Sequence, residues 1–145
     1  MTARARFVSM ALLAMLVLGA SACGSGKREA ASLVAAVDRY RRAPMESKAA
    51  PAALLEQVAC SDSEVCAAKT ACLQSAQPTV RGIRLKDEVN DTLDQLNQGR
   101  ITREQAAELD LSRKLDDASR AIEDGRKNLA KCDAKVISLR IKYAL

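Results

Sequence analysis

The 145-residue chain contains no His and no Trp, and it carries a formal net charge of +5 at pH 7. The absence of His excludes His-ligated metal sites and the Ser–His and Cys–His pairs used by many enzymes. Aromatic residues make up only 2% of a chain rich in Ala and Leu, so the composition favours an all-α fold packed through small residues over a β-sandwich.

The first 22 residues have the three parts of an export signal. Arg4 and Arg6 form a basic start, residues 7–18 are an apolar run of twelve residues, and residues 19–22 are small. The apolar run is too short for a comfortable membrane span, and this order of segments is typical of a secretory signal peptide. We therefore interpret residues 1–22 as a cleaved signal and exclude them from the fold.

The residues before Cys23 read Ala20-Ser21-Ala22, and this motif resembles the lipobox of bacterial lipoproteins. The resemblance implies cleavage before Cys23, a thioether-linked diacylglycerol on its sulfur and acylation of the new amino terminus. Ala20-Ser21-Ala22 also fits the A-x-A site of the ordinary signal peptidase, which would leave the thiol without lipid. Lipidation would use one of the five cysteines and leave four that can pair completely.

Acylation at Cys23 would anchor the protein to the bacterial envelope, facing the periplasm, because several acyl chains on one residue bind a membrane stably. Gly24 stands where an Asp favours the inner membrane in related lipoproteins, so the resemblance favours the outer membrane. No cofactor is expected apart from this covalent lipid. Residues 23–29 predict a short flexible tether, and residues 30–145 predict a single helical domain.

Two short helices are expected to open this domain. Apolar residues recur at helical spacing in residues 30–42, which predicts the first helix. Pro44 ends it, and residues 43–50 form a connector. Pro51 fits the first turn of a second short helix that extends to Val58.

A longer helix is expected from about residue 62 to residue 98. It begins at a capping cluster over residues 61–64 and carries Cys72 on its apolar stripe. Pro78 predicts a kink or a restart within this helix. Gly99 is a typical C-terminal stop, so the chain is expected to reverse at residues 99–101.

The strongest periodic pattern lies in the last helix, expected over residues 103–142 and about 60 Å long. Thr102 and Gln105 predict a capping box at its start. Apolar or small residues then alternate in steps of four and three, which is the heptad pattern of a coiled-coil or bundle helix. The pattern comprises Leu111, Leu115, Ala118, Ile122, Gly125, Leu129, Cys132, Val136, Leu139 and Tyr143.

The hairpin formed by these two helices predicts the disulfides. Residue numbers that face each other in an antiparallel hairpin add to about twice the turn position, which places Cys132 within a turn of Cys72. We therefore expect a Cys72–Cys132 bridge and a local Cys60–Cys66 bridge, out of three possible connectivities. No metal site is expected, because the cysteine spacing is unlike that of zinc sites and an exported chain meets oxidising conditions.

The basic C-terminal stretch is the candidate binding surface. Residues 104–124 contain seven acids and three bases, whereas residues 126–145 contain one acid and six bases. An anionic lipid surface, a cell-wall polymer or an acidic protein would fit these bases, and so would an ordinary solvated helix end that follows the helix dipole. The bases are Arg126, Lys127, Lys131, Lys135, Arg140 and Lys142.

An enzyme is not expected from this sequence. Adjacent carboxylates such as Asp116 and Asp117 diverge by about 100° on a helix, and residues 24–27 do not have the spacing of a phosphate-binding loop. Nucleic-acid binding is not expected either, because no aromatic platform accompanies the modest positive charge.

We expect a monomeric, non-enzymatic envelope lipoprotein that acts as a binding or scaffold module. It would present a helical surface to an envelope protein or a cell-wall polymer. Two alternatives remain open at this point: a structural coiled-coil oligomer of the envelope, and a holdase-like periplasmic chaperone that grips clients through exposed apolar residues between helix ends.

Overall fold

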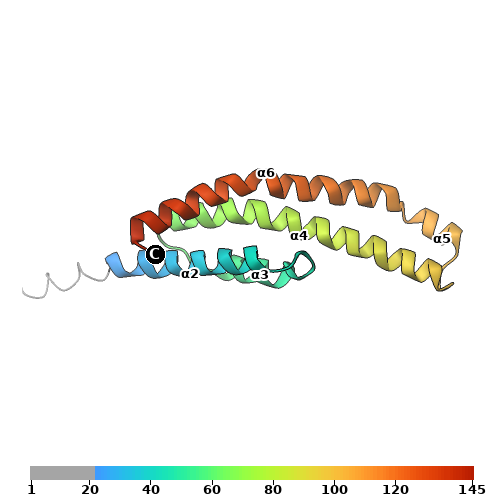
Figure 1. The fold of residues 1–145 in the computed structure, drawn as a ribbon, viewed down its shortest axis with the longest axis horizontal. Coiled ribbons are helices and arrows are strands. Elements are labelled where there is room, and N and C mark those ends of the chain that lie inside the picture. Colours follow the sequence, from blue (N-terminus) through green and yellow to red (C-terminus); the bar gives the residue numbers. More distant parts are fainter. Residues whose placement is uncertain (1–21) are drawn as a thin grey trace, which may run out of the picture.

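The computed structural model describes residues 22–145, and no strand is present in this part of the chain. The prediction of an all-α, disulfide-bridged helical bundle is confirmed. The described elements are α2 (Ala22–Arg42), a short 3-10 helix η1 (Met45–Ser47), α3 (Ala49–Gln57), α4 (Ser63–Asn97), α5 (Arg103–Glu108) and α6 (Leu111–Tyr143) (Figure 1). The predicted signal peptide lies outside the described residues, except for Ala22.

Helices α4 and α6 form a long antiparallel hairpin that organises the fold (Figure 1). The 35 residues of α4 span about 50 Å and continue as helix through Pro78. Asp62 caps α4, since its carboxylate accepts hydrogen bonds from the backbone N–H groups of Glu64 and Val65 at 2.9 and 3.1 Å. The turn after α4 includes Gly99 with a φ of 68°, as expected for a glycine that ends a helix.

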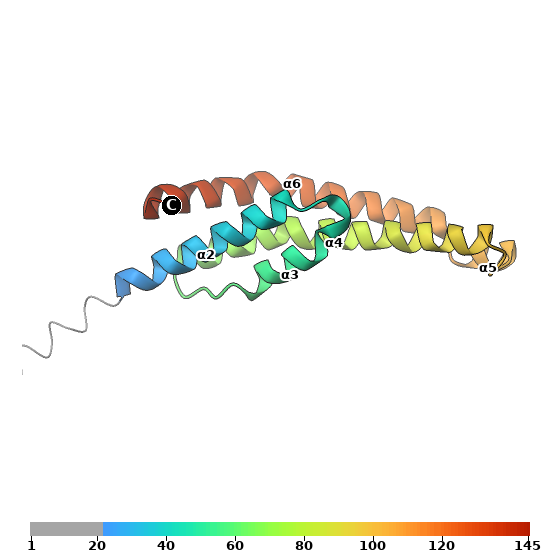
Figure 2. The same cartoon turned by 60° about the horizontal axis from the view of Figure 1, so that its bottom comes forward.

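Helices α2 and α3 cover only one half of this hairpin (Figure 2). The core lies in that half, where Leu33 of α2, Leu55 of α3, Val65 of α4 and Leu139 of α6 are all fully buried. The other half, here called the distal arm, comprises residues 85–122: the end of α4, all of α5 and the start of α6. In this arm α5 and α6 follow one another opposite α4, and neither α2 nor α3 packs on it (Figures 1 and 2).

Both predicted disulfides are present. Cys72 of α4 and Cys132 of α6 are bridged with a Cα–Cα distance of 4.5 Å, and this bridge ties the hairpin together within the covered half. Cys60 and Cys66 are bridged with a Cα–Cα distance of 5.2 Å and constrain the entry into α4. The hairpin register deduced from the turn position therefore identified the long-range pair correctly.

The prediction of a flexible tether before the domain is wrong. Residues 24–29 form the first turns of α2 instead, and Gly26 within them is buried. A Cβ atom at Gly26 would lie 2.9 Å from the hydroxyl oxygen of Tyr143, so this segment packs against the end of α6. The small and polar residues of this segment predicted flexibility. Packing against the end of α6 keeps the segment helical instead.

The prediction of one continuous last helix over residues 103–142 is also wrong. Leu109 and Asp110 separate α5 from α6, and Asp110 adopts a left-handed backbone conformation with a φ of 45°. The Asp110 carboxylate then caps α6 by accepting a hydrogen bond from the backbone N–H of Arg113 at 3.3 Å. This local cap starts a new helix at Asp110. The apolar pattern alone would favour one continuous helix through this position.

Candidate functional site

Three segments that are far apart in sequence meet at one end of the bundle, here called the anchor end. They are the start of α2, the start of α4 and the end of α6 (Figure 1). Tyr143 of α6 donates a hydrogen bond from its hydroxyl to a carboxylate oxygen of Asp62 at 3.0 Å. Cys23, the predicted lipidation site, lies in the first turn of α2 and therefore at this same end.

Glu29 of α2 holds the loop that leads into α4. Its carboxylate accepts hydrogen bonds from the Ser61 backbone N–H at 2.7 Å, the Ser61 hydroxyl at 2.6 Å and the Asp62 backbone N–H at 3.1 Å. The bonds from Ser61 hold the pKa of Glu29 below its ordinary value of 4.5. Bonds from the Val65 backbone and the Tyr143 hydroxyl likewise lower the pKa of Asp62.

Three of the six predicted basic residues are already paired within the chain. Arg126 binds Glu123 through two hydrogen bonds of 2.7 and 2.8 Å, one turn away on the same helix. Arg140 binds both carboxylate oxygens of Asp38 on α2, at 2.7 and 2.8 Å. These pairs fasten the helices to one another or stabilise α6, so they are not free charges for a partner.

Lys142 is the third paired base. Its ammonium lies 3.1 Å from Glu64 of α4 and 5.0 Å from the centre of the Tyr143 ring. Hydrogen bonding to Glu64 raises the pKa of Lys142 above its ordinary value of 10.5. The end of α6 is thus bonded to α4 through both Lys142 and Tyr143.

The remaining bases, Lys127, Lys131 and Lys135, are exposed and form no salt bridge with a described residue. They lie four residues apart, so they line up along α6. Beside them on the same exposed surface are Ile137 and Ile141, which are 56% and 78% exposed. We call these five residues the outer face of α6. The two isoleucines lie outside the heptad pattern and were not among the predicted site residues, although their spacing of four is visible in the sequence.

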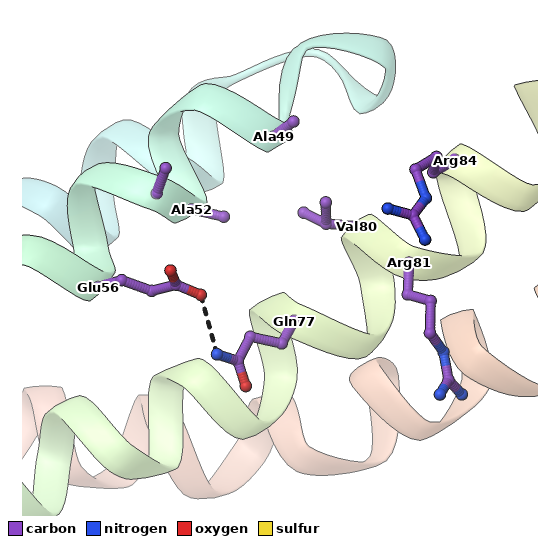
Figure 3. A pocket seen from close by; sticks show the side chains of 8 residues that line it. Ala49, Ala52, Glu56, Gln77, Val80, Arg81 and Arg84 are labelled. Carbon is purple, nitrogen blue, oxygen red and sulfur yellow. Dashed lines mark hydrogen bonds between the residues drawn. The ribbon is translucent and has the colours of Figure 1, made fainter.

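A groove of about 250 Å³ lies between α3 and α4 (Figure 3). Ala49 and Ala52 line its α3 side and Val80 lies on the α4 side, while Glu56 accepts a hydrogen bond from the Gln77 amide at 2.8 Å. Its other lining residues include Arg81 and Arg84, both exposed. The groove has small apolar walls and a cationic side.

A more apolar groove of about 290 Å³ lies where the end of α2 and η1 meet α4 and α6. Met45, Ile122 and Leu129 contribute its large apolar side chains. Lys48 lines one side of this groove. Its ammonium is held in place by Tyr40, since it donates to the Tyr40 carbonyl at 2.8 Å and lies 4.5 Å from the centre of the Tyr40 ring. Burial lowers the pKa of Lys48, consistent with its position against this surface.

The distal arm exposes large apolar side chains far from the core. Leu93, Leu109 and Leu115 are 42%, 44% and 41% exposed. The arm contains nine Asp and Glu residues and six Lys and Arg residues, whereas residues 23–84 and 123–145 together contain nine acids and fifteen bases. The arm is thus acidic and partly apolar, and the covered half of the molecule is basic.

No protein-family model, curated protein or solved structure matches this chain. The class of protein is therefore defined by the fold alone, as a disulfide-bridged all-α bundle built on a long helical hairpin. Of the helices in residues 22–145, none is both long and apolar enough to cross a membrane. Those residues also contain no grouping of three or more His, Cys, Asp or Glu side chains that could hold a metal ion.

Proposed function

We propose that this protein is a lipid-anchored, non-enzymatic scaffold of the bacterial envelope, and that its distal arm binds a partner protein. The anchor is the acylated Cys23, which the resemblance of residues 20–23 to a lipobox implies. The arm extends from the opposite end of the molecule, so it places a binding surface at a distance from the membrane. The outer membrane remains the favoured location.

The observation that carries this proposal is the incomplete cover of the hairpin. Helices packed as a single pair bury only the facing stripe of each, so apolar side chains beside that stripe stay accessible. In the distal arm, Leu93, Leu109 and Leu115 remain about two-fifths exposed instead of being shielded by α2 or α3. Exposed apolar side chains within a charged surface are typical of protein-binding sites. The acidic balance of the arm favours a partner with a basic surface.

The packing supports a monomer over a coiled-coil oligomer in the covered half. Cys132, Val136 and Leu139 of the heptad pattern are buried within the chain, so they are not free to pair with a second copy. In the distal arm, Leu115 of the same pattern is exposed. An oligomer or a chaperone would therefore have to use the arm, and both remain defined outcomes of the experiment below.

Site-specific photo-crosslinking in intact cells tests the arm. A photoreactive amino acid placed at Leu93 or Leu115 should give a discrete crosslinked partner band. The matched control is Leu54 on α3, which is 41% exposed, as is Leu115. Equal crosslinking from all three positions, or from Leu54 alone, would show that the arm is not the binding surface.

The identity of the crosslinked product separates the alternatives. A product at twice the mass of the chain would indicate a homo-oligomer, which light scattering of the purified protein would confirm. A smear of many products, together with suppressed aggregation of a test client, would indicate a chaperone. The anchor is tested separately: intact-mass analysis of envelope material should show acyl groups on the wild-type chain and none on the Cys23→Ser variant.

A further inference from the structure

We propose that the outer face of α6, formed by Lys127, Lys131, Lys135, Ile137 and Ile141, rests on an anionic lipid bilayer. The inference builds on the proposed anchor at Cys23, and it assigns an orientation to the protein on the membrane. The end of α6 lies at the membrane surface, and the distal arm is inclined away from it.

The apolar part of this face has no partner within the described chain. Ile141 is the most exposed large apolar side chain of residues 22–145 at 78%, and Ile137, one turn earlier, is 56% exposed. Both lie on the side of α6 opposite the buried Cys132, Val136 and Leu139. A pair of isoleucines kept in water on an outward helix face is costly, whereas the headgroup and acyl boundary of a bilayer would bury them.

The lysines flank the isoleucines on one side, as in helices that lie in the interface of an anionic membrane. Between Lys127 and the end of α6 the only acidic residue is Asp133, and it points toward α2, where it pairs with Arg41. Long lysine side chains can extend along such a surface toward phosphate groups. The charge of this face is therefore complementary to anionic headgroups.

The position of the face agrees with the predicted anchor. The end of α6 is bonded to the start of α4 at the anchor end through Lys142–Glu64 and Tyr143–Asp62. The Tyr143 hydroxyl also lies close to Gly26 at the start of α2. An acyl chain on Cys23 would hold this end within reach of the bilayer. Earlier along α6, the outward surface carries the acidic residues Asp116 and Glu123. The surface suited to anionic lipid therefore begins only after Glu123. The acidic distal arm would be repelled by the same lipids, which favours an inclined molecule over a flat one.

A single tryptophan reports on the contact, because the natural chain has none. The variants I141W, on the outer face, and L93W, on the distal arm, are prepared as acylated full-length protein matured in cells. Each is reconstituted into vesicles of phosphatidylcholine with phosphatidylglycerol. The I141W variant should show a blue-shifted emission and strong quenching by lipids brominated along the acyl chain. The L93W variant should show neither effect.

Two other results overturn the assignment, and a third leaves it to the unacylated protein. If I141W is not quenched although the acylated protein floats with the vesicles, the anchor stands and this face does not touch the bilayer. If I141W and L93W are quenched equally, the molecule lies flat and the assigned orientation is wrong. If mass analysis finds no acyl group, the proposed anchor fails, and binding of the unacylated protein to the same vesicles decides the face on its own.

Charge variants separate lipid binding from binding to a soluble polyanion. Unacylated protein carrying C23S should bind vesicles with phosphatidylglycerol, and K127Q/K131Q/K135Q should weaken that binding by about fivefold for each lysine removed. The matched triple variant K86Q/R100Q/R103Q removes three charges from the distal arm and should not weaken it. Equal binding of C23S to neutral vesicles, or binding only to polyglutamate, would refute the assignment. Circular dichroism confirms that each variant keeps its helices.

Discussion

Ser75 of α4 donates a hydrogen bond from its buried hydroxyl to the backbone carbonyl of Gly125 on α6, at 2.7 Å. This contact requires the two helix backbones to approach closely. Gly125 on α6 permits the approach here, and Gly82 on α4 permits a second close approach further along the hairpin. A Cβ atom at Gly125 would lie 2.7 Å from the Ser75 carbonyl oxygen, and one at Gly82 would lie 2.6 Å from that of Ala118. Small residues therefore allow α4 and α6 to pack closely against each other.

Substituting Gly125 tests this close approach. Helix propensity alone would make G125A more stable by about 1 kcal/mol. We expect the opposite result, a loss of about 1–3 kcal/mol in the free energy of unfolding, because the added methyl group overlaps backbone atoms that cannot move aside easily. The measurement is urea unfolding followed by circular dichroism.

The matched control is G24A in the first turn of α2, where a Cβ atom would meet nothing within 4 Å. There the propensity effect should act alone, so G24A should be neutral or stabilise by up to about 1 kcal/mol. If both variants become more stable, the helices do not pack as closely at Gly125 as the structure shows.

The two disulfides should differ in their contributions to stability. Cys72 and Cys132 are 60 residues apart, and Cys60 and Cys66 are 6 apart. In the chain-entropy model the long loop contributes about 4 kcal/mol and the short loop about 2 kcal/mol. The double variant C72A/C132A should therefore lower the free energy of unfolding about twice as much as C60A/C66A, as measured by urea titration under oxidising conditions. Equal losses would contradict the entropic explanation.

Much of this fold could be predicted from the sequence because its main signals are local or follow from simple geometry. The heptad pattern indicated α6, and the turn at Gly99 fixed the register that pairs Cys72 with Cys132. The capping box of Thr102 and Gln105 is present, with the Gln105 backbone N–H donating to the Thr102 hydroxyl at 3.2 Å. These features depend on residues close in sequence or on one reversal of the chain.

The errors have two causes, tertiary packing at the start of α2 and a local cap at Asp110. Gly24 and Gly26 suggested flexibility, but Gly26 is helical because Tyr143 packs on it from the other end of the sequence. The break at Asp110 is local: its carboxylate caps α6, and this capping signal was overlooked because the apolar pattern continues through it. The candidate site was likewise only partly predictable: the spacing of Lys127, Lys131 and Lys135 was visible, whereas the pairing of Arg140 with Asp38 requires knowledge of how α2 packs.

The bonds of Glu29 to the Ser61 loop make stability sensitive to acid. Because these hydrogen bonds lower its pKa in the folded protein, Glu29 stabilises the fold when ionised and loses that contribution as the pH falls through its folded pKa, below 4.5. Asp62 acts in the same direction, with a pKa held below 3.8. The melting temperature should therefore fall as the pH drops below about 4.5.

The variant E29Q should show a smaller decrease in melting temperature over the same acid range, because residue 29 no longer titrates. At neutral pH it should be less stable than the wild-type chain, and the difference should shrink as the pH is lowered. E46Q, at an exposed carboxylate in η1, is the control and should follow the wild-type curve. If E29Q and E46Q behave alike at all pH values, the Glu29 bonds do not stabilise the anchor end.

The capping box at Thr102 should control local opening of the distal arm more than global stability. The Gln105 side chain accepts a hydrogen bond from the Thr102 backbone N–H at 2.9 Å, and the Thr102 hydroxyl accepts one from the Gln105 backbone N–H at 3.2 Å. Neither α2 nor α3 packs on the short α5 (Figure 1). Removing the hydroxyl in T102A should cost about 1 kcal/mol in the opening of this turn. Backbone amide exchange should then be about fivefold faster across residues 103–108, and unchanged in α2 and around the Cys72–Cys132 bridge. Faster exchange throughout the chain would instead show that the arm and the covered half unfold as one cooperative unit.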